Sequence, residues 1–104
     1  MMQVFLMFSF RVNETFALES RRLFVLAGEM AGGQIQAGMI VSVPLNSSLS
    51  ISAPIHSIEF ARRTGGRDDV CLCIAYEDSD ELEIWKGLDL KNEMVKVVPA
   101  AHSV

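Results

Sequence analysis

The stretch from Gly33 to Asn46 constrains the fold of this chain more than any other segment. It reads G-Q-I-Q-A-G-M-I-V-S-V-P-L-N, and apolar residues take alternate positions after its last glycine. Glycine adopts the backbone angles of tight turns at little steric cost, and a period of two is typical of a strand. The pattern therefore predicts a turn and then a strand that ends at Pro44, as in a small closed β-sheet.

A longer alternation fills the first part of the chain. Even-numbered positions from 2 to 18 are apolar except for Glu14, whereas the odd-numbered positions are mixed. The pattern predicts one long strand, or two strands that meet at a bend near Asn13 and Glu14. The apolar start is too short to span a bilayer and lacks the flanking residues of a targeting signal. We therefore expect a cytoplasmic protein that does not enter a membrane.

Further short apolar segments predict more strands, over 23–27, 39–43, 55–63, 70–76 and 93–98. The first of these is continuously apolar, so we expect it to be covered on both faces. The segment 46–52 is serine-rich and predicts a loop. Within 55–63 we expect Ile58 and Phe60 to face inward. Leu82, Trp85 and Leu88 are spaced by three, which predicts a helical turn near 80–86 that packs Trp85 against one end of the sheet.

These elements together predict an all-β fold, namely a small six-stranded closed antiparallel β-barrel with one short helical turn. We expect a single domain over residues 1–104, with frayed ends at 1–3 and 100–104. Half of the residues are apolar and only 21% are charged. This composition is unusually apolar for a small domain, because a small domain has a large surface for its volume. Either a partner chain or a second copy covers part of this surface, or both sheet faces are half-buried with nothing bound.

Several segments match, in order and spacing, the strand motifs of one known family. They are 12–18, 24–28, 33–41, 57–59, 66–72 and 85–90, within about residues 10 to 98. In these segments the chain resembles the second domain of elongation factor Tu and related translation factors. The resemblance implies a six-stranded closed barrel, and it implies RNA or tRNA-end binding. The family's glycine-containing turn is replaced here by 19–22, and no G-x-x-x-x-G-K-[ST] loop occurs, so we expect no nucleotide binding.

The candidate binding residues are one glutamate and five arginines. Glu14 interrupts an apolar face, and the resemblance implies that it lies beside a pocket for the tRNA end; alternatively it reaches solvent at a strand bend. The arginines either form one basic patch, for RNA backbone or an acidic partner, or are dispersed surface charges: Arg21, Arg22, Arg62, Arg63 and Arg67. The net charge of −4 gives the chain no overall attraction to nucleic acid.

Other reactive side chains offer little chemistry. Cys71 and Cys73 lie two apart on one predicted strand, pointing away from the face of Leu72, and such side chains diverge too far for an easy disulfide. The carboxylate runs at 68–69 and 77–81 lack the ligand spacing and glycine of a calcium loop. We expect no metal, no cofactor and no catalytic residue. We therefore predict a non-catalytic module that binds a partner protein or a second copy, with RNA binding as the alternative and a cysteine-dependent enzyme as the third.

Overall fold

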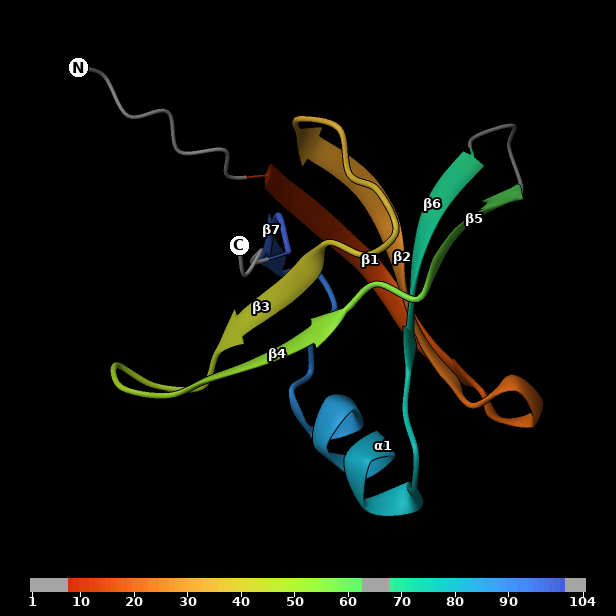
Figure 1. Ribbon diagram of the computed structural model, residues 1–104. Coiled ribbons are helices and arrows are strands. Elements are labelled where there is room, and N and C mark those ends of the chain that lie inside the picture. Colours follow the sequence, from red (N-terminus) through yellow and green to blue (C-terminus); the bar gives the residue numbers. More distant parts are fainter. Residues whose placement is uncertain (1–7, 63–67, 101–104) are drawn as a thin grey trace.

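The computed structural model describes residues 8–62 and 68–100, whose strands form one antiparallel sheet around a core (Figure 1). In chain order the elements are β1 (Phe8–Leu18), the 3-10 turn η1 (Glu19–Arg21), β2 (Leu23–Gly32), β3 (Ile40–Pro44), β4 (Ser50–Pro54), β5 (Ser57–Arg62), β6 (Asp68–Ala75), α1 (Ser79–Gly87) and β7 (Met94–Val98). The strand order across the sheet is β4-β3-β7-β1-β2-β6-β5. The predicted all-β class is confirmed. Of the ends expected to fray, 1–3 and 100–104, all residues except Ala100 lie outside the described residues, and Ala100 is half-buried.

The predicted closed six-stranded barrel is wrong, because the sheet has seven strands and its edge strands β4 and β5 do not pair. These two strands follow one another along a single stretch of chain. Ile55 N–H donates to the carbonyl oxygen of Met39 at 2.8 Å, and His56 N–H donates to that of Cys73, also at 2.8 Å. The chain thus passes from the β3 side to the β6 side within two residues, so β4 and β5 lie end to end. The loop predicted over 46–52 is shorter, since β4 begins at Ser50.

The predicted bend in the first strand is a β-bulge. The pairing of β1 with β2 matches Val12 with Gly28 and Glu14 with Ala27, so Asn13 is an extra residue. The bulge reverses the inward and outward faces, and the predicted even-numbered apolar face is therefore wrong after Asn13. Gly28 is required opposite the bulge, because an added Cβ would lie 1.8 Å from the carbonyl oxygen of Arg11.

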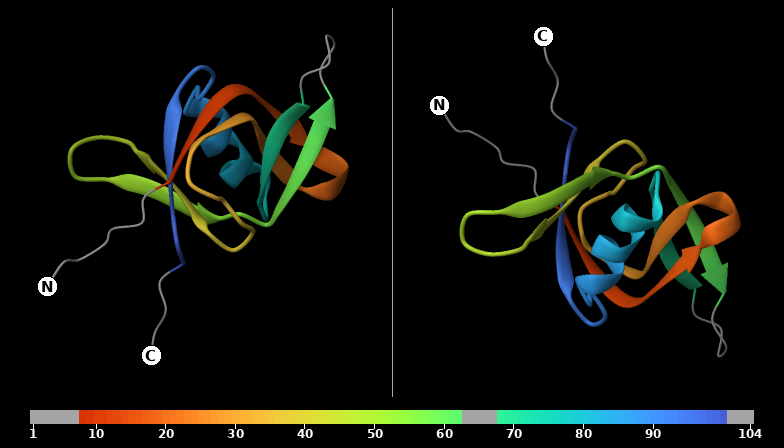
Figure 2. Two further views of the ribbon diagram at one scale, coloured as in Figure 1. Left: turned by 90° about the horizontal axis from the view of Figure 1, so that it is seen from above. Right: turned by 90° about the horizontal axis from the view of Figure 1, so that it is seen from below.

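The main core fills the space enclosed by the sheet, and α1 lies across one end of it (Figure 2). Trp85 is only 1% exposed, and its ring stacks on Phe24 with centroids 6.1 Å apart. The predicted helical turn and the inward Trp85 are confirmed. Asp78 caps the helix, because its side chain accepts a hydrogen bond from Glu81 N–H at 2.9 Å. Part of the acidic run 77–81 therefore begins a helix.

A second, smaller apolar cluster lies on the opposite face of β2 and β6. Its buried members are Leu23, Val25, Ala27, Cys71 and Cys73. This cluster confirms that the segment 23–27 is covered on both faces, since Phe24 and Leu26 belong to the main core.

The predicted inward position of Phe60 is wrong, because its side chain is 72% exposed. Ile58 packs against the main core as expected. Phe60 pairs with Val70, which is itself only half-buried. There the β5–β6 pair splays away from β1 and β2 (Figure 1).

Candidate interaction surface

Arg21 forms an ion pair with Glu59 across the outer face of the sheet. Its Nη2 lies 2.8 Å and its Nη1 3.4 Å from the two carboxylate oxygens of Glu59. Hydrogen bonding from Arg21 holds the pKa of Glu59 below its usual range, and the same bond raises the pKa of Arg21. Arg21 is thus engaged within the molecule, which leaves its guanidinium less available to an external phosphate.

The other predicted binding residues do not converge on this pair. Arg22 donates to the carbonyl oxygen of Glu77 at 3.5 Å, and Arg62 lies 3.6 Å from a carboxylate oxygen of Asp68. Glu14 is exposed beside the bulge. Arg62 and Glu59 lie three apart on β5, so alternation puts them on opposite faces of the sheet.

Arg63 and Arg67 lie outside the described residues. Within 8–62 and 68–100, Arg21, Arg22 and Arg62 contact three different residues, Glu59, Glu77 and Asp68, and the single basic patch stays a prediction.

The two cysteines are buried in the second cluster, and Cys73 is 1% exposed. Burial raises the pKa of both thiols, so both carry their proton at neutral pH. A protonated thiol is a poor nucleophile and a poor metal ligand. The described part of the chain holds no group of three or more His, Cys, Asp or Glu side chains that could bind a metal ion.

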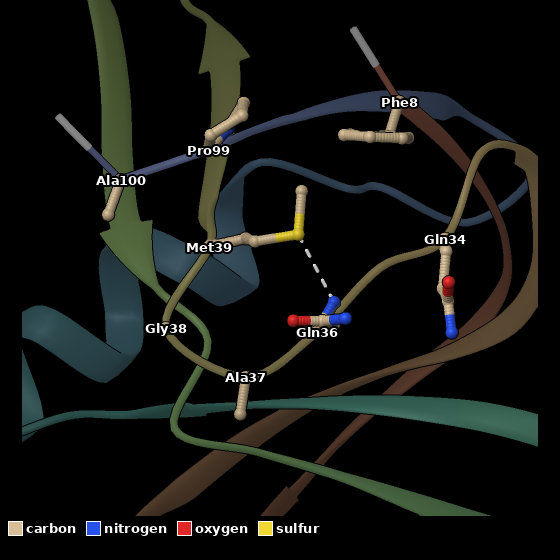
Figure 3. Close-up of a pocket in the computed structure, with 8 residues that line it drawn as sticks. All are labelled: Phe8, Gln34, Gln36, Ala37, Gly38, Met39, Pro99 and Ala100. Atoms are coloured by element: carbon tan, nitrogen blue, oxygen red, sulfur yellow. Dashed lines mark hydrogen bonds between the residues drawn. The ribbon is translucent and has the colours of Figure 1, made fainter. Parts of the chain in front are cut away.

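A shallow pocket of about 480 Å³ lies at the start of β3, and its lining residues are drawn in Figure 3. Its lining is uncharged and consists of Phe8, Gln34, Gln36, Ala37, Gly38, Met39, Pro99 and Ala100. The backbone N–H of Gln36 donates to the thioether sulfur of Met39 at 3.1 Å. The pocket lining contains no acid or base pair for catalysis.

Five of the eight lining residues, from Gln34 to Met39, belong to a much longer uncharged region. No Asp, Glu, Lys or Arg occurs from Met30 to Ile58, although many of these residues are exposed. The region includes the β3–β4 hairpin, which projects from the body of the molecule (Figures 1 and 2). The binding residues predicted from the sequence were chosen from clusters of charged side chains. The missing charge is equally visible in the sequence and would have indicated this surface.

The tip of this hairpin is ordered by its own hydrogen bonds. Asn46 Oδ1 accepts from the N–H groups of Ser48 and Leu49 at 2.8 and 2.9 Å, and Leu45 N–H donates to the carbonyl oxygen of Leu49 at 2.8 Å. These bonds form an Asx turn. Leu45 and Leu49 are nevertheless 49% and 61% exposed. The hairpin therefore presents two large apolar side chains on a fixed turn.

Strand β4 forms the free edge beside this tip. Alternate residues of an antiparallel pair bond to the partner strand, and the others direct their backbone groups to the far side. Pro54 lies opposite Ile40, and Pro44 lies opposite Ser50. In a hydrogen-bonded pair each residue donates its N–H to the other residue. Proline has no N–H, so neither of these two pairs can be a hydrogen-bonded pair. Ser50, Ser52 and Pro54 therefore direct their backbone groups away from β3.

We call this surface the uncharged edge, and it comprises the exposed residues Leu45, Leu49, Ser50, Ser52 and Pro54. No strand within residues 8–62 and 68–100 pairs with the far side of β4. Natural sheets protect such an edge with charged residues, proline, bulges or short strands, and of these β4 lacks charge and carries proline only at its last residue, Pro54. The opposite edge strand, β5, carries Glu59 and Arg62, whereas β4 carries no charge.

Comparisons of the chain with protein-family models, curated proteins and solved structures find no match. In the part of the chain that the structure describes, no helix has both the length and the apolar character needed to cross a membrane.

Proposed function

We propose that this protein is a non-catalytic interaction module that binds protein through the uncharged edge. The observation that carries the proposal is an edge strand with no charge and no partner strand within the described residues. Such an edge offers backbone donors and acceptors to an extended segment, and neighbouring apolar side chains add specificity. Leu45 and Leu49 are placed to supply that apolar contact.

Protein binding is favoured over RNA binding by the placement of charge. Affinity for nucleic acid depends on cations that are free to contact phosphates. Arg21 is paired with Glu59, Arg62 lies beside Asp68, and the chain has a net charge of −4. The uncharged edge itself offers no cation. RNA binding remains the expectation drawn from the resemblance to translation-factor barrels.

A peptide-display experiment tests the proposal. A library of random peptides is selected on the immobilised protein at 150 mM salt, and affinities of enriched peptides are measured by anisotropy. We expect uncharged, extended peptides with micromolar dissociation constants. The double variant Leu45→Ser/Leu49→Ser should weaken them at least tenfold, whereas the control Phe60→Ser, on the other sheet edge, should not. Equal binding by the double variant would contradict the proposal, as would failure to enrich any peptide on a protein that is monomeric under the same conditions.

A further inference from the structure

The backbone of β4 is suited to pair with a second copy of itself. Three residues direct backbone groups to the free side: Ser50 and Ser52 each offer an N–H and a carbonyl, and Pro54 offers a carbonyl alone. The proline lies at the end of the strand, so its missing N–H interrupts no central position. A five-residue strand of this kind can accept one antiparallel neighbour along its whole length.

We propose that two copies of this chain associate through an antiparallel β4–β4 pair with its two-fold axis at Ser52, an inference that rests on the proposed function and names its partner. In this register Ser52 of each copy donates to and accepts from Ser52 of the other. Ser50 N–H of each copy donates to the Pro54 carbonyl of the other. This register overlaps all five residues of the strand, which a shift in either direction would not.

The side chains fit this arrangement. A two-fold axis perpendicular to the sheet places serine opposite serine, Ser50 opposite Pro54, and Ile51 opposite Ala53. No like charges meet across the pair, and the small residues allow close approach. A different partner with charged residues would place them against a surface that has no counter-charge. The simplest complement to an uncharged edge is therefore the same edge on a second copy.

The other sheet edge shows the contrast. Strand β5 carries Glu59 and Arg62, and Glu59 is already bound by Arg21. Charged residues on an edge strand oppose pairing with another chain. We therefore expect association at β4 and not at β5, which supplies a matched control on the same molecule.

Sedimentation velocity from about 1 to 500 μM tests the inference with charge variants at the axis. Ser52 is exposed, so Ser52→Lys and Ser52→Glu should keep the wild-type circular dichroism and melting temperature. We expect the wild type to dimerise, each variant to dimerise at least tenfold more weakly, and an equimolar mixture of the two to form heterodimers. Ala61→Lys on β5 should dimerise as the wild type does. Ser50→Lys, also on the free edge, is a second variant should Ser52→Lys lose its fold.

A wild type that is monomeric throughout this range would overturn the inference, as would a Ser52→Lys variant that dimerises normally. The same variants separate this failure from failure of the proposed function. If the wild type is monomeric but still binds displayed peptides, and Ser52→Lys abolishes that binding, only the second copy as partner is wrong. If neither dimers nor peptide complexes form, both are wrong.

Discussion

The guanidinium of Arg21 lies 2.8 Å from the carboxylate of Glu59, and the pair lies over the thiol of Cys73, whose sulfur is 3.8 Å from the same oxygen. Arg21 comes from the turn η1, and Glu59 comes from edge strand β5. The contact therefore ties the β1–β2 turn to the far side of the sheet. It also covers part of the second apolar cluster.

The first prediction concerns acid stability. Because Arg21 lowers the pKa of Glu59, the folded state gains stability from this carboxylate above the ordinary pKa of a glutamate, about 4.3. That gain is lost as the pH falls through the lower pKa of the folded protein. Glu59→Gln should therefore reduce the loss of stability on acidification, measured as urea midpoints between pH 2.5 and 6. The control Glu83→Gln, on the exposed side of α1, should leave the profile unchanged; an unaltered profile for Glu59→Gln would contradict the assignment.

The second prediction concerns alkaline pH and the buried thiols. Thiols of the unfolded chain ionise near pH 8.5, whereas burial keeps Cys71 and Cys73 protonated in the folded state. Stability should therefore be fully retained below pH 8.5 and decline as the pH rises toward the raised pKa values. The double variant Cys71→Ala/Cys73→Ala should be less stable at pH 7 but show a shallower decline between pH 7 and 9.5. Equal slopes would show that the thiols are not the groups that titrate.

The third prediction tests the bulge through its facing glycine. Gly28→Ala should destabilise the fold by about 2–4 kcal/mol, because the new methyl group would collide with the backbone of Arg11. Gly32→Ala is the matched control on the same strand, since an added Cβ there meets no atom within 4 Å. We expect Gly32→Ala to change the free energy of unfolding by less than about 1 kcal/mol. Equal effects in urea denaturation would show that the close approach at Gly28 is not a constraint.

The fourth prediction concerns α1. Trp85→Ala removes the ring that stacks on Phe24 in the core, so it should cost about 3–5 kcal/mol and lower the near-ultraviolet dichroism. Ile84→Ala, one residue away on the exposed side of the helix, should cost less than about 1 kcal/mol. A small effect of Trp85→Ala would mean that the helix does not complete the core.

Periodicity predicted the strands well where each strand has one well-defined buried face. Alternation located β6 and the inward positions of Val70, Leu72 and Ile74, and spacing by three located Trp85 on a helix. The β1 alternation failed only after Asn13, because a bulge reverses the faces and leaves no mark in a count of apolar residues. Phe60 failed because periodicity reports the direction of a side chain and not whether the core extends that far.

Closure of the sheet and the candidate site were harder to predict. Whether β4 pairs with β5 depends on how the chain turns at Ile55 and His56, which is a matter of tertiary geometry. Arg21 and Glu59 are far apart in sequence, so their pairing could not be inferred from either residue alone. Strand β4 itself was hidden by its serines, which favour loops but are accepted on an exposed edge.

Amide hydrogen exchange across β4 tests the central claim most directly. Ile51 bonds to β3 within one molecule, whereas Ser52 directs its N–H to the free edge. We predict that the amide of Ile51 is protected at every protein concentration and that the amide of Ser52 becomes protected only as concentration rises. In Ser52→Lys the amide at position 52 should exchange rapidly throughout. Rapid exchange at Ser52 in the wild type at all concentrations, with Ile51 protected, would contradict the claim that this edge binds a second copy.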